Sequence, residues 1–193
     1  KSSSPVVIGS ASTAFTITQS GTCGSLATDY FRSRLASGNW STASSWESSP
    51  DNGVTPWITS TRVPDSAAKT ITVLTGHNII VAASLTGTSS VNEVVVSNGG
   101  TLTINSAITY NITNGAGTDL DVFGVVANAG TITNTGSAIV FEANSFYNHT
   151  NSTVTATAVP TATWNTTSTC IISGMTTAGP TAGTMSQSFG NVI

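Results

Sequence analysis

Residues 94–104 read Val-Val-Val-Ser-Asn-Gly-Gly-Thr-Leu-Thr-Ile: a short apolar run, then a glycine corner, then an alternating run. Glycine at the corner admits the backbone conformations of a tight turn, and asparagine tolerates them next best. In the alternating run, Leu102 and Ile104 share one face of a strand and the threonines share the other. The stretch therefore predicts short strands joined by a sharp corner.

The same arrangement returns along the chain. Residues 127–134 read Ala-Asn-Ala-Gly-Thr-Ile-Thr-Asn and predict a second corner leading into a strand. Apolar β-branched runs recur at 71–74, 94–96, 120–123, 139–141 and 170–172. Weaker runs lie between them at 78–81, 101–104, 131–133 and 154–158. The main runs start about 20 to 30 residues apart, which is the coil length of a solenoid built from short strands.

These runs predict an all-β fold, specifically a right-handed parallel β-helix. Each coil of such a solenoid forms hydrogen bonds with the next, and inward side chains of successive coils stack into one core. The alternative is an antiparallel β-sandwich, whose strands also recur with turns between them. Its hairpin signal, Asn-Gly, occurs at 98–99 and 114–115.

The residue composition of the sequence changes near residue 68. Residues 1–67 hold four of the six prolines and three of the four tryptophans, Trp40, Trp46 and Trp57. We expect residues 1–67 to form an irregular head that caps the β-helix, and residues 68–193 to form its coils. The three tryptophans are expected to pack in the cap, because a β-helix end exposes apolar side chains. The alternative is that they contact glycans.

Composition excludes several classes of protein. The 193 residues include 5 basic and 8 acidic side chains, with a formal net charge of -3. So few basic residues cannot neutralise a row of phosphates, which argues against nucleic-acid binding. No apolar run is long enough to cross a bilayer, so direct membrane insertion is not expected. The apolar fraction of 38% argues against disorder of the whole chain.

Several motifs resemble one family. Residues 29–34 (Asp-Tyr-Phe-Arg-Ser-Arg), 37–41, 45–48 and 76–81 look like the opening of large, repetitive secreted proteins of the Bacteroidota. Residues 163–174 and 185–189 are similar to a later segment of the same proteins. The resemblance implies a β-rich, adhesin-like surface protein exported by type IX secretion, of which this chain is the amino-terminal part.

The resemblance carries further expectations. It implies contact with the type IX secretion machinery and with cell-surface proteins or glycans. The triplet Asp65-Ser66-Ala67 resembles an O-glycosylation acceptor of these proteins, which would make Ser66 the modified residue. The family pattern often has a second cysteine shortly after residue 193, and the resemblance implies that Cys170 pairs with that residue. A pair between Cys170 and Cys23 stays open as the alternative, through a head segment that folds back along the β-helix.

Candidate catalytic, cofactor and metal residues are not found in the sequence. Asp119 and Asp121 are the one close acidic pair, and as i and i+2 of a strand they would share a face, where they predict solvation or a weak cation site. His77 and His149 are too far apart to form a metal-binding motif. We therefore expect no enzyme activity, no cofactor and no metal.

The function expected from these features is that of an extracellular structural or adhesive module, a stiff β-solenoid spacer at the cell surface. The alternatives are a carbohydrate-binding module and a polysaccharide-active β-helix enzyme. A third alternative is ice binding by the Thr-x-Thr runs at 101–103 and 131–133.

Overall fold

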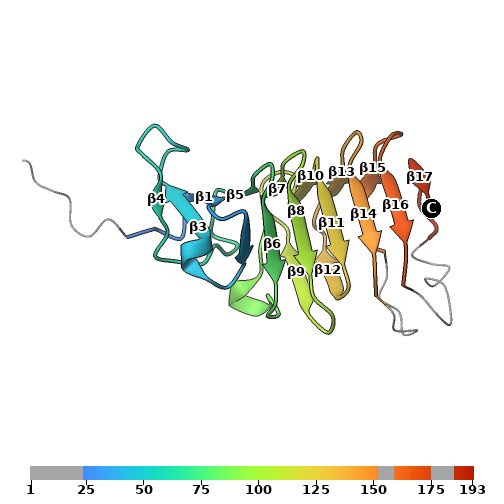
Figure 1. The fold of residues 1–193 in the computed structure, drawn as a ribbon, viewed down its shortest axis with the longest axis horizontal. Coiled ribbons are helices and arrows are strands. Elements are labelled where there is room, and N and C mark those ends of the chain that lie inside the picture. Colours follow the sequence, from blue (N-terminus) through green and yellow to red (C-terminus); the bar gives the residue numbers. More distant parts are fainter. Residues whose placement is uncertain (1–23, 152–158, 175–184) are drawn as a thin grey trace, which may run out of the picture.

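The computed structural model describes residues 24–151, 159–174 and 185–193. It is an all-β solenoid of about five turns, in which parallel sheets run along an elongated body (Figure 1). Within the described residues, helix is limited to two short 3-10 turns, η1 (Ala43–Ser45) and η2 (Gly87–Ser89). The predicted parallel β-helix is confirmed.

The first sheet has eight strands in the order β15-β13-β10-β7-β5-β1-β3-β4. Its strands are β1 (Tyr30–Ser33), β3 (Trp46–Ser49), β4 (Ile58–Thr59), β5 (Thr70–Val73), β7 (Val94–Val96), β10 (Leu120–Val122), β13 (Ile139–Phe141) and β15 (Thr163–Trp164). Pairing is parallel from β1 to β15 and antiparallel only where β3 joins β1 and β4 joins β3.

The second sheet has seven strands in the order β17-β16-β14-β11-β8-β6-β2, and every pairing in it is parallel. Its strands are β2 (Ser37–Asn39), β6 (Asn78–Val81), β8 (Thr101–Ile104), β11 (Val125–Asn128), β14 (Phe146–His149), β16 (Thr169–Ile172) and β17 (Asn191–Val192). A third sheet pairs β9 (Thr109–Thr113) with β12 (Thr131–Thr135), also in parallel.

From β5 to β16 consecutive strands lie in different sheets, which is why the sandwich alternative is wrong. The Asn98-Gly99 corner joins β7 of the first sheet to β8 of the second, so it closes a coil edge and not a hairpin. Each strand instead pairs with its counterpart about one coil away: Val94 lies beside Ile71 on one side and beside Leu120 on the other.

The core consists of inward side chains stacked in register from coil to coil. One row in the first sheet is Phe31, Ile71, Val94, Leu120 and Ile139. One row in the second sheet is Ile79, Leu102, Val126, Tyr147 and Cys170. All ten side chains are at most 2% exposed, so the stacking removes nearly all their apolar surface from water.

The two stretches that resemble each other, 97–104 and 127–134, occupy different corners. The first leads into β8 of the second sheet and the other into β12 of the third sheet. Gly99 has the positive φ of 76° that the corner predicts. At Gly130 the requirement is space, because a Cβ there would lie 2.3 Å from the carbonyl oxygen of Ile108.

The head is continuous with the solenoid. Strands β1 and β2 pair in parallel with β5 and β6, so residues 30–39 already belong to both main sheets. The change of composition near residue 68 coincides with the end of an insertion, residues 40–69, that contains β3 and β4. No helix among the described residues is long and apolar enough to cross a membrane.

Candidate functional site

Trp40 and Trp46 close the head end of the core. Both side chains are 0% exposed, and their rings meet edge to face with centroids 4.9 Å apart. The Trp40 ring also contacts Tyr110 of β9 at 5.6 Å. Each indole N–H is satisfied internally, Trp40 by the carbonyl of Pro64 and Trp46 by the carbonyl of Trp40. These two rings plug the first coil and present no face to a glycan.

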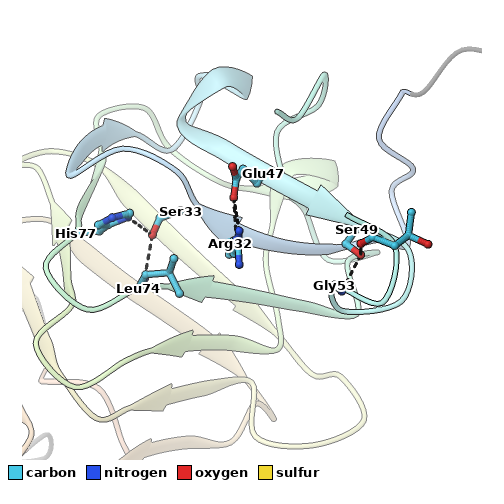
Figure 2. Close-up of polar contacts among 8 residues, drawn as sticks. Arg32, Ser33, Glu47, Ser49, Gly53, Leu74 and His77 are labelled. Carbon is cyan, nitrogen blue, oxygen red and sulfur yellow. Dashed lines mark hydrogen bonds and ion pairs between the residues drawn. The ribbon is translucent and has the colours of Figure 1, made fainter. Parts of the chain in front are cut away.

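Trp57 lies on the outside of the head and is partly exposed. The Arg32 guanidinium stacks over its ring at 4.3 Å and forms an ion pair with Glu47 at 2.7 Å. Figure 2 shows Arg32 and Glu47 reaching toward each other from the neighbouring strands β1 and β3. The arginine covers one face of the indole and leaves the rest partly exposed. Because Trp40 and Trp46 are fully buried, Trp57 is the only one of these three tryptophans with surface for a ligand.

His77 is a corner residue. Its Nδ1 lies 2.8 Å from Oγ of Ser33, and the same hydroxyl accepts the backbone N–H of Leu74 at 2.9 Å. Figure 2 shows this group at the turn between β5 and β6. The contact joins β1 to the next coil. It gives His77 a structural role in the turn.

A second polar group in Figure 2 shapes the loop after β3. The Ser49 hydroxyl accepts the backbone N–H of Gly53 at 2.8 Å and donates to Asp51 at 2.9 Å. Hydrogen bonds from Thr55 lower the pKa of the Asp51 carboxyl. The group holds a tight loop on the surface of the head.

Ser66 lies in a turn between the head and β5 and is partly exposed. The Asp65 carboxylate accepts the backbone N–H of Ala67 at 2.9 Å, and its carbonyl accepts the N–H of Ala68 at 3.1 Å. The turn therefore presents Ser66 at the surface, next to Ala67 and Ala68, which line a groove.

A shallow groove of about 460 Å³ runs beside this turn. Its polar and aromatic lining comes from Tyr30 of β1, Lys69, Asn92 and Glu93, and its apolar lining includes Ala116. Lys69 Nζ lies 5.2 Å from the centre of the Tyr30 ring and donates to the carbonyl of Pro50. Glu93 has a φ of +51°, and its Oε1 accepts the backbone N–H groups of Ala116 and Gly117. Four successive coils thus meet at this groove.

Asp119 and Asp121 do not act together as a pair. Asp119 is 0% exposed, and its two carboxylate oxygens accept the backbone N–H groups of Gly115 and Ala138. Asp121 lies on the outer side of β10, where burial and the nearby Glu142 raise its pKa. Asp119 therefore holds two loops in place, and the shared solvated face expected for the pair is not formed.

A buried polar group interrupts the core of the later coils. In one row of the second sheet, Val81 and Ile104 are followed by Asn128 and His149. Asn128 donates to the Tyr147 hydroxyl at 2.9 Å, and that hydroxyl lies 3.1 Å from Nδ1 of His149. His149 is 0% exposed, its Nε2 has no hydrogen-bond partner, and burial lowers its pKa. His149 is therefore held in the neutral form inside the solenoid.

Cys170 is a free and buried thiol next to Tyr147 in the core, and burial raises its pKa to about 11. Cys23 lies outside the described residues. The thiol of Cys170 is therefore protonated at neutral pH and packs as a small apolar group.

The two Thr-x-Thr runs lie in different sheets. Thr101 and Thr103 belong to β8, whereas Thr131 and Thr133 belong to β12. Thr133 donates to Asn111, whose amide donates to Ser90, so part of the third sheet forms polar rows across coils. The two runs do not line up into the flat array that ice binding needs.

Within residues 24–151, 159–174 and 185–193, no group of three or more His, Cys, Asp and Glu side chains could hold a metal ion. No family model, no curated protein and no solved structure matches this chain.

The groove was not predictable from the motifs. Tyr30 is in one motif, but Lys69, Asn92 and Glu93 are far from it in sequence, and only the register of the coils brings them together. The one available signal is Lys69 itself, the last basic residue of the chain.

Proposed function

We propose that this chain is an extracellular structural and adhesive module of the cell surface, in which the coils form a stiff spacer and the head closes one end. The observation that carries the proposal is the unbroken parallel pairing from β1 to β15 in the first sheet and from β2 to β17 in the second. Coils that share one core and a continuous hydrogen-bond ladder bend less than a chain of separate domains.

The surface chemistry supports an exposed location. Only 13 of the 193 side chains, 5 basic and 8 acidic, are charged, and outward positions in β8 and β12 carry threonines. Neutral hydroxyl surfaces of this kind suit close contact with glycans or with other surface proteins, because little charge has to be desolvated. Export by the type IX machinery and modification at Ser66 are part of the same proposal.

The test uses intact cells of the source. An antibody raised against the head, residues 24–69, should label intact cells, and external protease should remove the label. Cells that lack the gene should adhere more weakly to the surfaces or partner cells that the wild type colonises. Labelling that needs cell lysis would contradict the surface location, and unchanged adhesion would contradict the adhesive role.

A further inference from the structure

The groove beside the head has the chemical make-up of a sugar-binding site. We propose that the groove lined by Tyr30, Lys69, Asn92 and Glu93 binds a neutral saccharide unit of one or two rings. Its volume of about 460 Å³ lies in the range of small-ligand sites. The inference names a ligand class for the adhesive part of the proposed function and, to that extent, rests on it.

Hydrogen-bonding capacity in the groove is only partly used. The Lys69 ammonium donates to one acceptor, the carbonyl of Pro50 at 3.1 Å, which leaves two of its N–H donors. Glu93 uses Oε1 for two backbone N–H groups, at 2.8 Å and 2.9 Å, which leaves Oε2 as an acceptor. Donors and acceptors side by side are what a ring of hydroxyl groups requires.

The apolar part of the groove fits the C–H face of a pyranose. Tyr30 is half-buried on the outer side of β1, and Ala67, Ala68 and Ala116 add small apolar walls. A sugar ring that packs against the tyrosine would remove apolar surface of both from water, and its hydroxyl groups would point toward Lys69 and Glu93.

Charge in the groove favours a neutral ligand. Among the described residues that line it, only Lys69 and Glu93 are charged, and their charges are opposite. A carboxylate or sulfate would gain from Lys69 but would be repelled by Glu93, whereas a hydroxyl group can accept from one and donate to the other. The groove is also preorganised, because the backbone N–H groups of Ala116 and Gly117 hold the Glu93 carboxylate in place, which lowers the entropy cost of binding.

The experiment measures binding of a defined panel: cellotriose, xylotriose, mannotriose and laminaritriose, with trigalacturonate as the acidic comparator. Titration should detect at least one neutral trisaccharide, and the Tyr30→Leu/Lys69→Met double variant should weaken it at least tenfold. The matched control is Trp57→Ala, which removes the other partly exposed aromatic of the head and should leave the affinity within twofold.

Folding is checked by the thermal unfolding transition of each variant. If the double variant does not fold, amide shifts of the labelled wild type decide the location: the neutral sugar should perturb Lys69, Glu93 and Ala116. Absence of binding to all four neutral sugars overturns the inference, as does binding that survives the double variant or shifts that map elsewhere. None of these outcomes alters labelling on intact cells, so failure of the site is distinguishable from failure of the surface location.

Discussion

Gly124 is a residue at which the coil corner has no room for a side chain. It joins β10 to β11, and a Cβ there would lie 2.3 Å from the carbonyl oxygen of Gly100 and 2.4 Å from that of Ser97. Because both obstacles are backbone atoms, neither can rotate away. We expect Gly124→Ala to lower the free energy of unfolding by roughly 2–3 kcal/mol, measured by denaturant titration. Gly117→Ala is the control: its Cβ would meet Glu93 at an ordinary 3.4 Å, so equal losses in both variants would contradict the explanation.

The buried His149 predicts a stability that depends on pH. Burial lowers its pKa in the folded chain, whereas in the unfolded chain the pKa returns to about 6.5. As the pH falls below that value, His149 is protonated in the unfolded chain but stays neutral in the folded chain. The contribution of His149 to the free energy of unfolding is therefore complete above pH 6.5. It declines as the pH falls toward the folded-state pKa, by at most about 1.4 kcal/mol per pH unit.

Among the described residues, the polar groups of the network around His149 supply no compensating negative charge. Burial raises the pKa of Tyr147 and that of Cys170, so both are neutral in this range, and Asn128 does not titrate. We expect His149→Asn to flatten the dependence of the unfolding free energy on pH between about 6.5 and 5. If the unfolding free energy of His149→Asn depends on pH as steeply as that of the wild type, the pH dependence comes from other groups.

At the scale of the element, the cap should be held by its buried rings. Trp40 is 0% exposed and contacts both Trp46 and Tyr110, so it links the insertion to the third coil. We expect Trp40→Ala to cost about 3–5 kcal/mol of unfolding free energy. The exposed stack of Arg32 on Trp57 should be worth about 1 kcal/mol or less, so Trp57→Ala is the matched comparison. Similar losses in denaturant titrations of the two variants would show that the buried rings do not anchor the cap.

Some strands are predictable from the sequence almost to the residue. The apolar runs at 94–96, 139–141 and 78–81 coincide with β7, β13 and β6, because they are short, continuous and rich in β-branched residues, with glycine in the neighbouring turns. The run at 170–172 is part of β16, which lies in the second sheet, whereas the other four main runs lie in the first. The predicted run at 154–158 lies outside the described residues.

Other strands escape the pattern for a physical reason. In β11 and β14 the inward positions include Asn128 and His149, polar side chains that the hydrogen bonds around Tyr147 make tolerable in the core. A periodicity search that expects apolar inward residues cannot find such strands. The groove escapes for another reason: its residues are neighbours across coils, and register is not visible in a single sequence.

For the whole molecule, the coil behaves as a unit of length. Val94 and Leu120 are register partners, so residues 94–119 form one complete coil, and the carbonyl of Asp119 accepts the N–H of Val94. Four extra copies of 94–119 inserted after Asp119 should therefore stack on themselves with the same contacts. Adjacent strands are about 4.8 Å apart, so the particle should lengthen by about 19 Å.

Small-angle scattering distinguishes stacking from other outcomes of that insertion. If the copies stack, the maximum dimension rises by about 19 Å and the cross-sectional radius of gyration stays constant, because coils are added along the axis. The control protein carries the same four copies, each with the substitution Leu102→Asp. Leu102 is buried in the core row, so a charge at this position should prevent the copies from stacking. A larger cross-sectional radius of gyration in the protein with four unsubstituted copies would mean that the added coils do not extend the shared core. A spacer built from such coils would not be stiff.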